Sequence, residues 1–218
     1  MIADRRRQKK TGGCRHEDRR HLSFIFLYFL LSSLIFSSCE ADNEYSTWAC
    51  QFGYDNSVHV DATLASCMDV NVPGMFCLIT ESVQGGVKYL NFKSNYNTTS
   101  SQVESEAEKR AKYILGLNNG IIVGYQNAVL DDLGRAVFVA YDVQCPNCVR
   151  ETGNKLSPNF GVTMSDNGIA TCGKCGRKYN MNFGGILQNG QQSDDKGLEK
   201  YDAHTSGPYG YISVSRHR

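Results

Sequence analysis

Residues 137–148 read Val-Phe-Val-Ala-Tyr-Asp-Val-Gln-Cys-Pro-Asn-Cys, and residues 172–185 read Cys-Gly-Lys-Cys-Gly-Arg-Lys-Tyr-Asn-Met-Asn-Phe-Gly-Gly. Each stretch holds a Cys-x-x-Cys motif, and 23 residues separate the two motifs. Two residues between cysteines let a tight turn direct both sulfurs to one side of a metal ion, and a second such turn completes a tetrahedron. Pro146 stiffens the first turn, while Gly173 and Gly176 leave room for backbone amides beside the thiolates. The sequence therefore predicts a metal site with four ligands: Cys145, Cys148, Cys172 and Cys175.

Disulfide bonds or buried thiols in an exported protein are the alternative for these four cysteines. A Cys-x-x-Cys disulfide closes a small strained ring and is usually redox-active. A thioredoxin-like site would require one motif at a helix N-terminus within an α/β pattern. We expect neither motif to lie in that setting.

The rest of the chain predicts a mainly β fold. Short apolar or alternating runs bounded by turn residues indicate six strands: residues 75–80, 87–92, 121–125, 136–141, 178–182 and 209–215. Residues 101–115 predict a helix, because acidic residues come early and basic residues late, matching the helix dipole. These elements favour an antiparallel β sandwich or barrel.

Residues around the two motifs resemble the Rieske iron–sulfur domain, whose two loops read C-P-x-H and C-x-x-H-G, followed by an aromatic strand and a Gly turn. The resemblance covers about residues 75–216 and is strongest over residues 136–186. It implies a Rieske-like antiparallel β base with a small metal-binding knuckle subdomain at about residues 141–186.

The ligand set departs from that family. Cys148 and Cys175 stand where the Rieske domain has histidines, and no other histidine (His59, His204, His217) is placed to replace them. Four cysteines are the ligand set of rubredoxins and zinc ribbons. Three occupants stay open: zinc, a single iron as a rubredoxin-like electron carrier, or a four-Cys [2Fe-2S] cluster of lowered potential.

A basic head and an apolar segment begin the chain. Residues 1–38 hold eight Lys or Arg and three acidic residues, and residues 22–36 carry no charge. This order is typical of an export signal. As a helix the apolar segment would rise about 22 Å, short of the roughly 30 Å membrane core. That length favours a cleaved signal peptide over a signal anchor. Residues 19–24 also resemble a twin-arginine signal, which would favour a cofactor inserted before export.

Cys39 follows two serines and precedes an acidic stretch, an arrangement that resembles the lipobox of bacterial lipoproteins, although Phe36 departs from the usual Leu. In that family the cysteine is acylated and becomes the mature N-terminus. We therefore expect a signal peptide or signal anchor at residues 1–38, a lipidated tether and irregular lead-in at 39–74, and the Rieske-like domain at 75–218. Ordinary cleavage without lipid is the remaining alternative. The expected location is the cell envelope, with a membrane-anchored lipoprotein facing the periplasm or the cell surface.

Charge and motifs exclude several function classes. Residues 39–218 hold 15 basic and 19 acidic residues, so a basic surface for nucleic acid is not expected. The sequence has no nucleophile elbow, phosphate loop or H-E-x-x-H motif, and four cysteines would close the coordination of a zinc ion, so no catalytic activity is expected.

Two hypotheses follow. The first is a membrane-attached Rieske-like protein that transfers electrons to a redox partner through a four-Cys iron or iron–sulfur centre. The second is a non-redox binding or scaffold lipoprotein with a structural four-Cys zinc. Outside the motifs, one pair among Cys50, Cys67 and Cys77 could form a disulfide, and the sequence leaves that pairing open.

Overall fold

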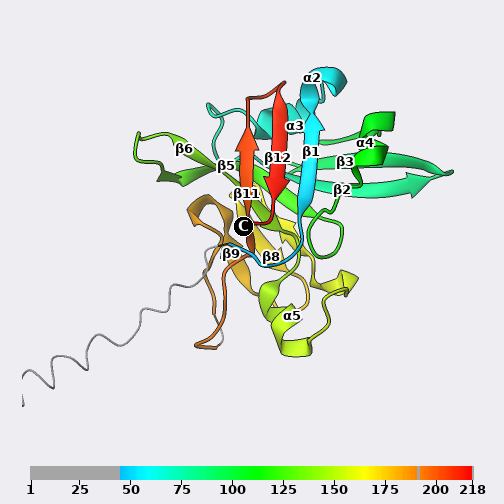
Figure 1. Ribbon diagram of the computed structural model, residues 1–218. Coiled ribbons are helices and arrows are strands. Elements are labelled where there is room, and N and C mark those ends of the chain that lie inside the picture. The colour runs from blue at the N-terminus through cyan, green and yellow to red at the C-terminus, as the bar shows by residue number, and fades with distance from the viewer. Residues whose placement is uncertain (1–44, 191, 218) are drawn as a thin grey trace, which may run out of the picture. The chain divides into compact units, whose positions relative to one another are not determined.

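Antiparallel strands dominate the computed structural model, which describes residues 45–190 and 192–217 (Figure 1). The strands of the larger sheet are β1 (Gln51–Asp55), β2 (Phe76–Gln84), β3 (Val87–Ser94), β4 (Thr99–Val103), β5 (Ile121–Leu130), β6 (Ala136–Asp142), β11 (Lys200–Thr205) and β12 (Tyr211–Ser215). Among the described residues these eight strands form a curled half-barrel in the order β1-β12-β11-β6-β5-β2-β3-β4. The predicted mainly β, antiparallel fold is confirmed.

A tight turn sets the register of the hairpin formed by β2 and β3. β2 and β3 pair from Cys77 opposite Ser94 to Gln84 opposite Val87. Gly85 and Gly86 connect them with φ values of 57° and 80°, which L side chains rarely adopt. Because strand side chains alternate between faces, this register sends Cys77 into one buried cluster and its neighbour Phe76 into another.

A smaller sheet lies between β6 and β11 in the chain. Its strands are β7 (Val162–Met164), β8 (Ile169–Cys172), β9 (Lys178–Asn180) and β10 (Ile186–Leu187), in the order β10-β9-β8-β7. Three short helices accompany it: α5 (Pro146–Thr152), η1 (Pro158–Phe160) and η2 (Met181–Phe183). We call residues 143–199 the metal-binding lobe. It packs on the larger sheet, because Phe76, Ile122 and Tyr141 share a core with residues of the lobe.

Both ends of the lobe meet at one point of the larger sheet. Tyr141 of β6 pairs with Lys200 of β11. The amide of Asp142, the residue just before the lobe, donates to the carbonyl of Glu199, the last residue of the lobe, at 2.9 Å. The lobe therefore runs past residue 186, the end expected from the sequence.

The lead-in predicted as irregular over residues 39–74 is regular between residues 51 and 67, so that expectation is wrong there. β1 pairs with β12, and Phe52 and Tyr54 are buried in the larger core. Two helices follow, α2 (Asn56–His59) and α3 (Ala62–Cys67). Asp55 and Asp61 cap them by accepting hydrogen bonds from backbone amides.

The predicted helix over residues 101–115 is much shorter. The observed helix is α4 (Glu106–Ala111), and residues 99–103 form β4, which pairs with β3. Ser105 begins the helix in a capping box with Glu108. The strand pairing overrides the helical pattern of the first residues, because ladder hydrogen bonds to β3 satisfy their backbone groups.

No helix within residues 45–190 and 192–217 is long and apolar enough to span a lipid bilayer. The expected export signal of residues 1–38 and the expected lipidation site Cys39 lie outside the described residues. The signal and the lipid anchor therefore stay predictions.

Candidate metal centre

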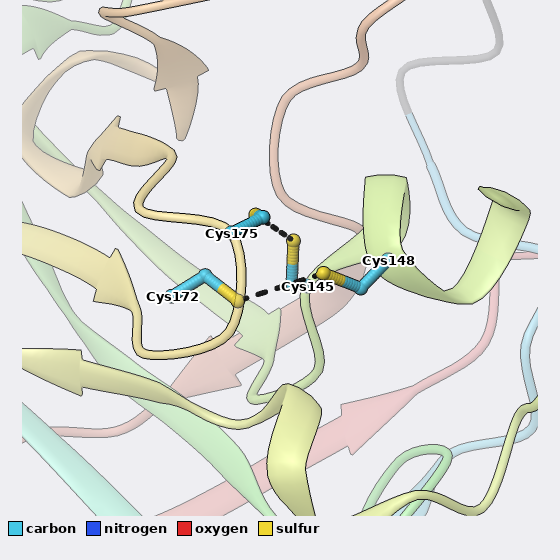
Figure 2. Close-up of side chains that lie close together, drawn as sticks. All are labelled: Cys145, Cys148, Cys172 and Cys175. Atoms are coloured by element: carbon cyan, nitrogen blue, oxygen red, sulfur yellow. Dashed lines mark hydrogen bonds between the residues drawn. The ribbon is translucent and has the colours of Figure 1, made fainter. Parts of the chain in front are cut away.

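Two separate parts of the lobe bring the four motif cysteines together (Figure 2). Cys145 and Cys148 lie at the start of α5, Cys172 ends β8, and Cys175 lies on the turn between β8 and β9. Their side chains face one another in Figure 2. The structure thus brings together all four ligands that the sequence predicts.

The four sulfurs lie close enough together to bind one ion. The Cys145–Cys175 and Cys148–Cys172 sulfurs are each 3.7 Å apart, and all four lie within 4.8 Å of one another. Metal–sulfur bonds of about 2.3 Å place tetrahedral sulfurs about 3.8 Å apart, whereas a disulfide requires about 2.05 Å. None of the four forms a disulfide in the structure.

Helix α5 positions the first pair. Cys145 is its N-cap residue with extended backbone angles, and Pro146 occupies the first helical turn. The Cys148 amide donates to the Cys145 sulfur. The first motif therefore does lie at a helix N-terminus, but its surroundings are antiparallel β rather than the α/β pattern of a thioredoxin-like site.

A tight turn positions the second pair. The amides of Lys174 and Cys175 donate to the Cys172 sulfur, and the Gly176 amide donates to the Cys172 carbonyl at 2.9 Å. Gly176 has φ +73°, so a side chain there would strain the turn. A Cβ would meet nothing within 4 Å at either Gly173 or Gly176, so the expectation that these glycines provide space is wrong, and only the backbone angle of Gly176 calls for glycine.

Hydrogen bonding between the thiols makes one of them the preferred thiolate. The pKa of Cys172 is lowered to about 5, first by a hydrogen bond from the Cys145 thiol and then by backbone amides. The same contact raises the pKa of Cys145, and burial raises that of Cys148 to about 12. Because a metal ligates thiolates, binding an ion here must release protons.

Tyr179 and Asn147 form a second layer around the first motif. The Tyr179 hydroxyl lies 2.9 Å from the Cys145 sulfur, and the Asn147 amide donates to that hydroxyl oxygen at 3.1 Å. With its oxygen accepting from Asn147, Tyr179 can turn its proton toward the sulfur. Asn147 is held in turn by the backbone of Lys196, through hydrogen bonds of 2.8 Å and 2.9 Å.

Arg177 forms a buried clamp beside the second motif. Its side chain is 1% exposed and makes two 2.9 Å hydrogen bonds to the Asp195 carboxylate. It also donates to Glu151 of α5 at 2.6 Å and to Cys175. One guanidinium therefore joins α5, the loop before β11 and a ligand of the centre.

The histidines considered in the sequence lie in other settings. His59 pairs with Glu108 at 3.0 Å, and His217 pairs with Asp202 at 2.8 Å. His204 lines a shallow hollow of about 440 Å³ over β5, β6 and β11. Sequence reasoning missed Tyr179, Asn147 and Arg177, although all three lie within or close to the motifs. For Asp195, an acidic residue in a turn, the sequence carries no signal.

No family model, curated protein or solved structure matches this chain. Its assignment therefore rests on the residues of the centre. What those residues support directly is a four-cysteine cluster that could hold a metal ion.

Proposed function

We propose that the four cysteines hold a single zinc ion, and that this ion is the structural centre of the lobe. The sulfur spacing carries the proposal, because 3.7 Å between cross-motif pairs is close to the edge of a single-ion tetrahedron. A [2Fe-2S] cluster puts two irons and two bridging sulfides between its thiolates, so ligands of different irons lie farther apart. Four sulfurs within 4.8 Å of one another favour one ion.

The chemistry of the donors supports zinc and a structural role. Zinc prefers closed tetrahedral thiolate sites, and four protein ligands leave no position for a substrate. When bound, the ion supplies charge and cross-linking, worth about 10 kcal/mol or more in small zinc domains. The residues of this chain orient the site: amides and Tyr179 donate to the sulfurs, and Arg177 holds α5 against the second motif.

Electron transfer through a single iron or a [2Fe-2S] centre is the second candidate. One observation favours it: Cys175 is partly exposed while the other three ligands are buried, so one edge of the centre reaches the surface. The resemblance of the two motifs to the Rieske loops points the same way. In this case the partner would be a redox protein that docks beside Cys175.

We further propose that the protein works at the surface of a membrane in the cell envelope. The basic head, the apolar residues 22–36 and the lipobox-like Cys39 support an anchor by lipid or by an uncleaved signal segment. With a structural zinc, the protein would then be a binding or scaffold lipoprotein rather than a redox carrier.

Metal analysis with an absorption spectrum tests the centre, using the full chain purified in detergent without oxygen. We expect one zinc per chain and no visible absorption. One iron with visible thiolate-to-iron absorption would support the electron carrier, and two irons with matching sulfide would establish an iron–sulfur cluster. X-ray absorption would add a single metal–sulfur distance of about 2.3 Å for one ion.

A further inference from the structure

Within residues 45–190 and 192–217, three cysteines lie outside the centre, and two of them meet in the larger core. Cys67 ends α3 and Cys77 is the second residue of β2, and both belong to the same buried cluster. Their exposed fractions are 1% and 0%. Helix α3 packs directly against β2 and β3.

Successive turns bring these residues together. The Val72 amide donates to the Asp69 carbonyl at 3.1 Å, and the Met75 amide donates to the Val72 carbonyl at 3.4 Å. The chain therefore reverses between α3 and β2. This reversal brings the start of β2, which holds Cys77, back toward α3.

The Cys67 and Cys77 side chains interact with each other, whereas Cys50, in the same buried cluster, has a different contact. The Cys67 sulfur also lies 3.5 Å from the Thr63 carbonyl oxygen and 3.7 Å from the Ser66 hydroxyl, and the Cys77 sulfur lies 3.6 Å from the Leu78 carbonyl oxygen. Cys50 instead contacts the backbone of Gly116. The structure thus divides these three cysteines into a candidate pair, Cys67 and Cys77, and a single thiol, Cys50. The sequence alone left this division open.

We propose that Cys67 and Cys77 form a disulfide when the protein matures in contact with a disulfide oxidant. One sulfur–sulfur bond forms, and two electrons and two protons pass to the oxidant; with glutathione disulfide the products are the protein disulfide and two molecules of glutathione. Because both thiols are buried, the exchange takes place while the chain is folding. The bond ties α3 to β2 and closes a short loop, leaving Cys50 as a thiol.

Peptide mapping tests this pairing on the full chain. The reduced chain is refolded from urea with zinc in a buffer of reduced and oxidised glutathione, and free thiols are then alkylated. A protease that cleaves before aspartate puts Cys50, Cys67 and Cys77 on separate peptides, 42–54, 61–68 and 69–130. We expect peptides 61–68 and 69–130 to be joined, two hydrogens lighter than their sum, and to separate on reduction.

Matched variants make the result decisive. Cys50→Ser should keep the linked peptides, and Cys77→Ser should lose them while circular dichroism verifies folding. The oxidised wild-type chain should also melt about 5 °C or more above the reduced chain. Alkylation of both Cys67 and Cys77, in a buffer that oxidises a control dithiol protein, would overturn the proposal. A link from Cys50 to either residue would do the same.

Discussion

The Tyr179 hydroxyl lies 2.9 Å from the Cys145 sulfur, inside a buried part of the lobe. Asn147 donates to the hydroxyl oxygen, which orients the phenol. A donor held in this way stabilises thiolate charge at the moment of ligation. Metal affinity should therefore depend on a residue that is not itself a ligand.

Replacing Tyr179 by phenylalanine should weaken metal binding while leaving one ion per chain at saturation. The ring still fills its place, but the Cys145 thiolate loses its donor, and outer-layer partners of this kind typically contribute 10-fold to about 100-fold in affinity. Competition with a chelator measures the change. Tyr209→Phe, at an exposed position, is the control and should bind as the wild type does. If Tyr179→Phe and the wild type bind the metal with equal affinity, the Tyr179 hydroxyl does not contribute to the centre.

Loss of a ligand should empty the centre and unfold the lobe. Cys145→Ser or Cys172→Ser leaves three thiolates, and the ion is then too weakly held to stabilise residues 143–199. Metal analysis should find less than one ion per chain, and amide hydrogen exchange should become fast in the lobe but stay slow in β2 and β3. Cys50→Ser, a buried cysteine of the other core, should keep full metal content. A ligand variant that retains its ion would contradict the site.

Arg177 should be one of the most costly residues to remove. Arg177→Met leaves the Asp195 carboxylate, which is 2% exposed, without its two-pronged partner. Breaking a buried pair of this kind costs about 3 kcal/mol in the free energy of unfolding. Urea unfolding of the metal-loaded chain measures the loss, and Arg177→Lys should recover only part of it, because the ammonium lacks the planar fork. A loss below about 0.5 kcal/mol would show that Arg150, which also contacts Asp195, is sufficient to neutralise that carboxylate.

The contribution of Glu104 to stability should fall as the pH rises toward 7. This residue is 3% exposed, and its pKa is raised to about 7, first by burial and then by hydrogen bonding and charge repulsion with the Glu81 carboxylate. Between about pH 4.5 and 7 the folded chain binds more protons than the unfolded chain, so the free energy of unfolding decreases with pH. The decrease amounts to about 3 kcal/mol.

Glu104→Gln checks the origin of this pH dependence. The glutamine side chain stays neutral, so the free energy of unfolding of the variant should change less between pH 5 and 8 than that of the wild type. Urea titrations at a series of pH values provide the comparison. A wild-type slope that persists in the variant would assign the effect to another group.

Membrane attachment should depend on Cys39. If the chain is lipidated there, Cys39→Ala should move the protein from the membrane fraction to the soluble fraction of the cells that export it. Fractionation after an alkaline carbonate wash is the measurement. Continued membrane association would identify residues 22–36 as a lasting anchor instead.

The sequence predicted local chemistry better than long-range pairing. The Cys-x-x-Cys spacing specified all four members of the centre, since two residues between cysteines allow few geometries. The hairpin of β2 and β3 was equally accessible, because two glycines mark its turn. Both features depend only on residues close together in the chain.

Elements defined by distant partners were not accessible in this way. β1 pairs with β12 at the other end of the chain, and Phe52 and Tyr54 stand in a segment rich in turn residues. Residues 99–103 carried a polar, helix-like pattern, and only pairing with β3 makes them a strand. Asp195 was missed for the same reason, because its role comes from its hydrogen bonds with Arg177, which is distant in the sequence.

The adjoining ends of the metal-binding lobe have a consequence for how this architecture can vary. The chain leaves the half-barrel at the end of β6 and re-enters it at the start of β11, and these two strands are hydrogen-bonded neighbours. The length and sequence of the lobe can therefore change without shifting the register of any strand in the larger sheet. The constraint on any replacement is the apolar face of Phe76, Ile122 and Tyr141, which must stay covered. The ligands and the length of the lobe can therefore change while the larger sheet keeps its geometry.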